Sequence, residues 1–145
     1  MPLLLYIVAL FVELGDLMKK INVVKSNRDF NSIISKNKSY KYKDYIIYLS
    51  KNDSNVHRFG ISVGKKVGNA VTRNKVKRQI RSIIDEKSYK NGFDCIIIVG
   101  KKILFRSFDE MKSNLHHAFK ELDILEEKEK WERKLLFYYW LLLFF

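Results

Sequence analysis

One stretch of this sequence is rich in cationic side chains that could bind an anionic ligand. Residues 65–81 read KKVGNAVTRNKVKRQIR, in which seven of 17 residues are basic and none is acidic. Arginine can bind phosphate bidentately or stack on a base, and asparagine can donate to and accept from a base edge. The segment therefore predicts a phosphate-binding surface. A solvated basic helix face without a ligand is the alternative.

The element that must position these cations is a helix over Val71–Glu86. On a helical wheel of about 100° per residue, four apolar residues fall within roughly one third of the circumference. They predict a stripe that faces the core, and they are Val76, Ile80, Ile83 and Ile84.

The cations lie beside that stripe. Arg73, Lys77 and Arg81 are four residues apart and share one side of the helix, and Asn74 and Arg78 continue the polar face. Like charges at this spacing cost a helix a few tenths of a kcal/mol per pair. The binding of a polyanion would neutralise these charges and offset the cost of their repulsion.

The residues before the helix add a second phosphate-binding feature. Gly68 allows a tight turn, and Asn69 can cap the next turn through its side chain. The unpaired N–H groups and partial positive charge of a helix N-terminus favour phosphate.

Composition places these features in one basic domain. The 145 residues are 47% hydrophobic, enough for a buried core, and carry 28 Lys and Arg against 16 Asp and Glu, a net charge of +12. Residues 18–125 alone carry a net +14. A charge of this sign attracts nucleic acid or an anionic membrane surface.

Both ends differ from this basic middle. Residues 1–17 are apolar and hold no basic residue, whereas 126–145 hold four charges of each sign and finish in LLFYYWLLLFF. Each apolar run is shorter than the roughly 20 residues of a membrane-spanning helix. We expect 1–17 to be an extension upstream of a start at Met18, and we do not favour membrane contact through the apolar ends. The tail could pack on the domain, lie on a membrane, or be an appendage, and these stay open.

Capping signals and side-chain patterns predict a single α+β domain with the order α-β-β-α-β-α. The indicators are a helix cap at Ser26, strands at Tyr45–Ser50 and Arg58–Val63, the helix at Val71–Glu86, a strand at Phe93–Val99, and a capping box at Ser107–Glu110. A strand, helix, strand succession implies a parallel pair joined by a crossover.

Metal and disulfide chemistry is not indicated. Cys95 is the single cysteine and lies in an apolar run, which predicts a buried inert thiol and suits a reducing cytoplasm. His57, His116 and His117 have no metal-ligand spacing with it, and we interpret the adjacent His116 and His117 as partly exposed surface residues. Asp85 and Glu86 are adjacent and diverge on a helix, so they form no paired-carboxylate site.

The string from Gly68 to Arg81, GNAVTRNKVKRQIR, resembles the signature of the bacterial ribonuclease P protein subunit. The resemblance extends over about residues 18–122. It includes the Asp29-Phe30 pair, the GISVGKK that precedes the signature and the DCIIIV that follows it.

The resemblance implies a fold similar to the second domain of ribosomal protein S5, with a left-handed βαβ crossover. It implies that the signature helix and its preceding loop bind a catalytic RNA through Lys65, Lys66, Asn69, Arg73, Asn74, Lys77, Arg78 and Arg81. It also implies a cleft for the single-stranded 5′ leader of precursor tRNA, formed by Phe30, Ile34, Ile46 and Tyr48, with plain core packing as the alternative for Phe30 and Tyr48.

Two positions depart from the family pattern. Ile34 stands where an aromatic residue is common, so only apolar contact is expected there. Gly64 replaces a frequent serine before the lysine pair and removes a hydroxyl contact.

The implied activity is Mg²⁺-dependent hydrolysis of one phosphodiester of precursor tRNA in the cytoplasm, with the Mg²⁺ held mainly by the RNA. The protein would be a subunit of this endoribonuclease, with no catalytic residue, no metal ligand and no obligate protein partner of its own. A basic RNA-binding module of ribosomal or chaperone type is the alternative. A self-sufficient protein nuclease and a peripheral membrane protein are further rivals.

Overall fold

The computed structural model describes residues 3–10, 23–126 and 128–145. The expectation that translation starts at Met18 concerns residues that mostly lie outside these ranges. Of the first 17 residues, the structure describes 3–10, which form a helix. The remaining elements, in chain order, are α2 (Asn27–Lys36), β1 (Ser39–Tyr42), β2 (Tyr45–Lys51), β3 (Arg58–Val63), α3 (Ala70–Asp85), β4 (Phe93–Val99), the 3₁₀ helix η1 (Lys101–Phe105), α4 (Phe108–Glu121) and α5 (Lys128–Phe144).

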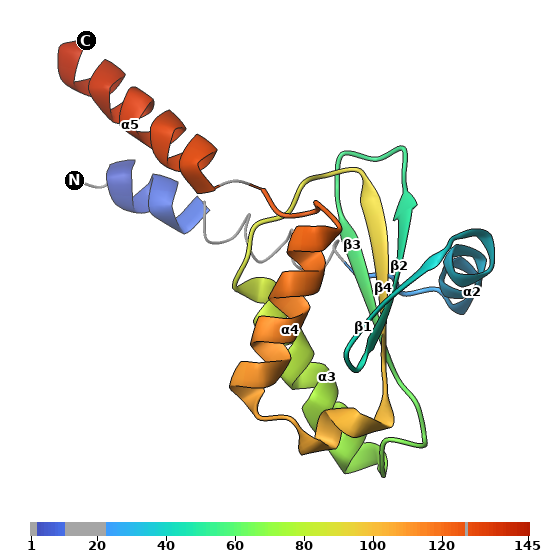
Figure 1. The fold of residues 1–145 in the computed structure, drawn as a ribbon. Coiled ribbons are helices and arrows are strands. Elements are labelled where there is room, and N and C mark those ends of the chain that lie inside the picture. The colour runs from blue at the N-terminus through green and yellow to red at the C-terminus, as the bar shows by residue number, and fades with distance from the viewer. Residues whose placement is uncertain (1–2, 11–22, 127) are drawn as a thin grey trace.

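Four strands form one mixed sheet in the order β1-β2-β4-β3. The pairs β1–β2 and β2–β4 are antiparallel, whereas β3 and β4 are parallel and joined through α3, as the sequence pattern predicts. Helices α3 and α4 cover one face of the sheet and α2 lies on the other (Figure 1). The molecule is thus an α+β domain with a helical layer on each face.

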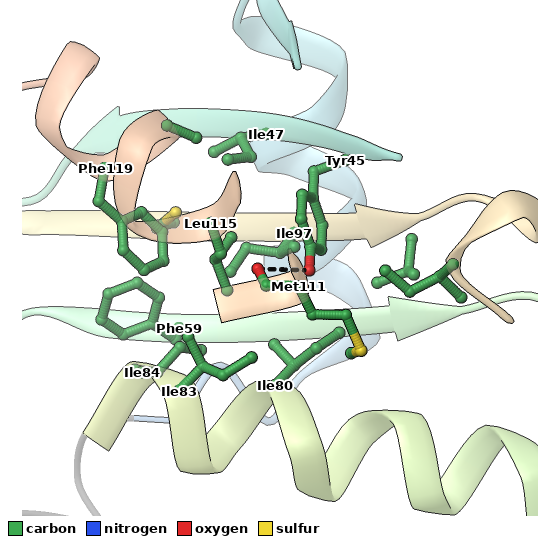
Figure 2. Close-up of a cluster of buried hydrophobic side chains, with 14 of the residues drawn as sticks. Tyr45, Ile47, Phe59, Ile80, Ile83, Ile84, Ile97, Met111, Leu115 and Phe119 are labelled. Atoms are coloured by element: carbon green, nitrogen blue, oxygen red, sulfur yellow. Dashed lines mark hydrogen bonds between the residues drawn. The ribbon is translucent and has the colours of Figure 1, made fainter. Parts of the chain in front are cut away.

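The main core lies between the sheet and the α3–α4 layer. All four residues of the predicted stripe are buried in it, and Cys95 is buried as expected. Figure 2 shows its centre, where the Tyr45 hydroxyl donates a hydrogen bond of 3.1 Å to the Met111 carbonyl between sheet and α4. The buried hydroxyl of Tyr45 is therefore satisfied and links the sheet to α4.

Local capping sets where the helices begin. The Ser26 hydroxyl accepts from the Asp29 N–H at the start of α2. At α4 the capping box is complete, because the Ser107 hydroxyl accepts from Glu110 N–H and the Glu110 carboxylate accepts from Ser107 N–H. Both helix starts were predicted correctly, since a capping residue acts on its own next turn.

The predicted element order needs a correction, because β1 precedes the first predicted strand. Its four residues SYKY are half-exposed and pair only with β2, through a turn in which Lys43 adopts a positive φ of 52°. So short an edge strand shows no apolar pattern of its own. The 3₁₀ helix η1 and the terminal helix α5 are also additions to the predicted order.

The ends of the chain keep their apolar side chains exposed. Large apolar residues of 3–10 and of 135–145 are mostly more than half exposed. In the part of the chain that the structure describes, no helix combines the length and the apolar character needed to cross a bilayer.

Candidate nucleic-acid interface

The start of α3 is fixed by its own side chains. Asn69 is the N-cap, and its side-chain oxygen accepts a 2.9 Å hydrogen bond from the Thr72 N–H. A Cβ at Gly68 would meet the Thr72 methyl group at 3.0 Å. A larger residue at position 68 would therefore crowd the Thr72 side chain, whereas the backbone of Gly68 is not left-handed.

Helix α3 turns its cations away from the core. With its apolar stripe buried, Arg78 and Arg81 are exposed, and Arg73 and Lys77 are half-buried beside the stripe. Asn74 is exposed on the same polar face. The loop before α3 adds Lys65 and Lys66, both exposed. We call the six cations the cationic ridge: Lys65, Lys66, Arg73, Lys77, Arg78 and Arg81.

No cation of the ridge forms an ion pair with any residue that the structure describes. Arg73 also leaves its Nε atom, which is buried, without a hydrogen-bond partner. An unsatisfied buried N–H costs free energy, so a rearrangement of Arg73 toward an anion would be favourable. The ridge is a surface of positive charge that the fold itself does not neutralise.

The four residues predicted to form the leader cleft lie together on the opposite face of the sheet. Phe30 and Ile34 of α2 and Ile46 and Tyr48 of β2 are all half-buried. Three of them pack against the small cluster of Val24, Ile33 and Ile96. We call the surface formed by Phe30, Ile34, Ile46 and Tyr48 the α2 cleft, after the leader cleft that the resemblance implies. Their partial exposure leaves apolar surface available to a ligand.

Gly60 makes room for the ring of Phe30. A Cβ at Gly60 would lie 2.7 Å from the Ile96 Cδ1 atom and 3.0 Å from the Phe30 ring. The ring of Phe30 thus lies close above a strand position that has no side chain. Any larger residue at Gly60 would have to displace that ring or Ile96.

A polar cavity of about 220 Å³ lies beside α2. Its polar lining includes Asp29 and Lys36 of α2, the C-cap residue Asn37, and one residue from each of three strands: Ser50, Arg58 and Asp94. The three strand residues are neighbours in the sheet register, because Asp94 lies opposite both Ser50 and Arg58. One side of α2 therefore faces apolar side chains and another side faces polar ones.

Arg58 is held in place by a buried carboxylate. Its Nε and one terminal nitrogen donate to the two oxygens of Asp94 at 2.8 and 2.6 Å, and Asn52 donates to the same carboxylate at 2.8 Å. Burial raises the pKa of Asp94, but the hydrogen bonds from Arg58 and Asn52 outweigh it and the pKa lies below its ordinary value. The pair fixes Arg58 beside the cavity.

Sequence reasoning did not single out Arg58, Asp94 or Gly60. A signal for Asp94 exists, because a charged residue inside the apolar strand FDCIIIV must find a partner when it is buried. Which residue pairs with it depends on the strand register. Gly60 has no such signal, since its role depends on where Phe30 lies.

The described residues offer little catalytic chemistry of their own. Burial raises the pKa of the Cys95 thiol, so it stays protonated and unreactive. Within these residues no three His, Cys, Asp or Glu side chains are grouped so that they could hold a metal ion. His57 and His116 are half-buried and His117 is exposed.

An α+β domain with an unneutralised cationic helix on one face is typical of proteins that bind a polyanion. The Ribonuclease P family matches residues 18–123 of the chain. The ribonuclease P protein component of Mesoplasma florum is 43% identical over 102 residues, which cover 68% of this chain and 93% of that protein.

Solved structures agree with the fold. An RNase P protein mutant of Staphylococcus aureus has a TM-score of 0.69 at 31% identity, covering 77% of this chain and 97% of that chain. The RNase P protein of Thermotoga maritima has a TM-score of 0.62 at 29% identity, covering 68% and 94%. The chain belongs to the ribonuclease P protein family, the protein component of the endoribonuclease that processes the 5′ end of tRNA together with an RNA subunit.

Proposed function

We propose that this chain binds the catalytic RNA of ribonuclease P through the cationic ridge and the 5′ leader of precursor tRNA through the α2 cleft. The observation that carries the proposal is the ridge. Its six cations have no ion-pair partner among the described residues, while the apolar stripe of the same helix is fully buried. Phosphates of an RNA backbone supply the missing negative charge.

Asn69 and Asn74 are proposed to contribute polar contacts beside the cations. The side-chain oxygen of Asn69 is committed to the helix cap, so its NH₂ group is the part left to donate. Asn74 is exposed and can donate and accept. The RNA-facing set is thus Lys65, Lys66, Asn69, Arg73, Asn74, Lys77, Arg78 and Arg81.

The α2 cleft suits single-stranded RNA. Half-exposed aromatic rings at Phe30 and Tyr48 can stack on unpaired bases irrespective of sequence, and Ile34 and Ile46 add apolar contact. The role of the chain is then to hold two RNAs together by reducing their mutual repulsion. Precursor tRNA is bound by its leader and the catalytic RNA by its backbone.

Mg²⁺ does not fit this surface. Mg²⁺ takes oxygen ligands, usually carboxylates and phosphates, and the ridge offers cations and amides. We therefore assign the Mg²⁺ ions of the reaction to the RNA and derive no step through the protein. Residues 18–125 form the proposed functional domain, and we place its action in the cytoplasm, which the buried thiol of Cys95 suits.

Reconstitution tests the proposal. The full chain is mixed with a bacterial ribonuclease P RNA and a precursor tRNA at low Mg²⁺, and cleavage at the mature 5′ end is measured. We expect cleavage that neither component supports alone. If the RNA cleaves no faster with the protein, the proposal is wrong. Cleavage by the protein without RNA would favour a self-sufficient nuclease.

A trimmed substrate separates this role from that of a general RNA-binding module. Precursor tRNA with its leader should bind the complex more tightly than mature tRNA. Equal binding of the two would favour a basic module of ribosomal or chaperone type, because such a module needs no leader cleft.

A further inference from the structure

Phe105 is an unusual side chain for the surface of a polar protein. It ends the 3₁₀ helix η1 and is 85% exposed, and its neighbour Leu104 is 49% exposed. Neither residue belongs to the motif that identifies the family. A large apolar group kept in water is the kind of feature that marks a contact surface when its surroundings also point to a ligand.

The turn that carries Phe105 is firmly attached to the domain. Ile103 is 2% exposed and lies in the main core, and Gly100 N–H donates to the Asp44 carbonyl at 2.7 Å. After Phe105, the Arg106 Nε donates at 2.9 Å to the Asp44 carboxylate, which is buried. With both sides of η1 anchored, Phe105 is presented on a rigid support.

The sheet places this turn beside the ridge. Parallel strands β3 and β4 end at the same edge of the sheet, since Val63 lies opposite Val99. The lysine pair 65–66 and the start of α3 follow β3, and η1 follows β4, so all of them share that edge (Figure 1). We call it the carboxyl edge.

The charge of the carboxyl edge is predominantly positive. Lys65, Lys66, Lys101 and Lys102 are all exposed there, and none of them forms an ion pair with a described residue. Asp109 and Glu110 open α4 nearby, and Glu110 is occupied by its capping box. An exposed aromatic ring among unpaired lysines is the combination that binds single-stranded nucleic acid, with the ring stacking on a base and the lysines on its phosphates.

We propose that Phe105 stacks on an unpaired base of the catalytic RNA and extends the ridge contact onto η1. The inference rests on the proposed function, because it takes the RNA at the ridge to be its partner. Helix α2, which carries Phe30 and Ile34, lies on the opposite face of the sheet from α3 (Figure 1). The leader of precursor tRNA, which we assign to the α2 cleft, is therefore not the RNA assigned to Phe105. Leu104 adds apolar surface beside the ring.

Binding of the full chain to a bacterial ribonuclease P RNA tests this proposal. Phe105→Ala should weaken binding about tenfold, and Phe105→Tyr should restore it, because a stacked base contributes on the order of that factor. Phe105→Leu keeps much of the apolar surface without a ring and should fall near the alanine variant. Phe137→Ala, which removes a 59% exposed ring from α5, is the matched control and should bind like the wild type.

The salt dependence distinguishes stacking from charge. Phe105→Ala should leave the slope of log affinity against log salt unchanged, since a phenyl ring releases no counterions. Wild-type affinity in Phe105→Ala, or full affinity in Phe105→Leu, would overturn the stacking contact and leave the proposed function standing. A wild-type chain that fails to bind the RNA would overturn both.

Discussion

Arg58 and Arg106 each donate to a carboxylate that is almost fully buried, whereas Arg73, Arg78 and Arg81 of α3 form no ion pair with any described residue. The paired arginines lie at the two ends of the sheet. Arg58 starts β3 opposite Asp94, and Arg106 follows η1 and reaches Asp44 before β2. Both have their charge neutralised inside the protein.

This difference distinguishes the arginines that stabilise the fold by ion pairing from the arginines that we propose bind RNA. A buried carboxylate needs its arginine, because leaving it unpaired would cost several kcal/mol. The ridge arginines stabilise nothing by ion pairing and repel one another slightly. Substitutions in the two regions should therefore change different measurements: stability for the paired set and RNA affinity for the ridge.

The largest effect on stability is expected from Asp94→Ala. It removes the two carboxylate oxygens that accept from Arg58 and one of the two acceptors of the Asn52 side chain, and Arg58, 30% exposed, can recover only part of its hydration. We expect a loss of about 2–3 kcal/mol in the free energy of unfolding, measured by urea denaturation. Lys90→Ala is the control, because its pair with Asp123 is exposed and contributes less than about 1 kcal/mol. Equal losses in the free energy of unfolding for the two variants would contradict the prediction that the buried ion pair stabilises the fold more than the exposed one.

The α2 cleft gives a second, intermediate effect. Tyr48→Ala should weaken binding of leader-bearing precursor tRNA to the reconstituted complex about tenfold, because a stacked base is worth about 1–3 kcal/mol. Mature tRNA should bind as before. Tyr40→Ala removes a half-buried ring that packs on the main core instead and should affect neither affinity. If Tyr48→Ala weakens both substrates equally, Tyr48 does not contact the leader.

The smallest effect is a pH dependence at His57, whose ring stacks on Phe93 and lies edge-on to Phe59. Burial lowers the pKa of His57 below its ordinary value, although the contacts with Asn91 and Glu126 oppose the shift. As the pH falls through the unfolded-state pKa of about 6.5, the unfolded chain takes up a proton that the folded chain resists. Stability should therefore decrease, and this loss should be smaller in His57→Phe.

Urea denaturation at a series of pH values measures this contribution. A His57→Phe variant whose stability changes with pH as steeply as that of the wild type would exclude His57 as its source.

Local signals explain what could be predicted from the sequence. The caps at Ser26, Asn69 and Ser107 act on their own next turn, and the apolar stripe of α3 follows the helical period. These features fix the helices and the outward direction of the ridge cations before any tertiary contact is known.

Features that depend on strand register could not be predicted. The pairing of Arg58 with Asp94, 36 residues apart, follows only once β3 and β4 are aligned. The need for glycine at position 60 depends on α2 laying Phe30 across that strand. Strand β1 is too short and too exposed to show a pattern.

The salt dependence of binding to ribonuclease P RNA tests the central claim most directly. Replacing Arg73 and Arg78 together by alanine should reduce the magnitude of the slope of log affinity against log salt by roughly 1.4–1.8, since each phosphate contact contributes about 0.7–0.9. A double variant of Lys51 and Lys120, two exposed lysines outside the ridge, should keep the wild-type slope. A wild-type slope in the arginine variant would contradict the account, because those side chains would then release no counterions from the RNA.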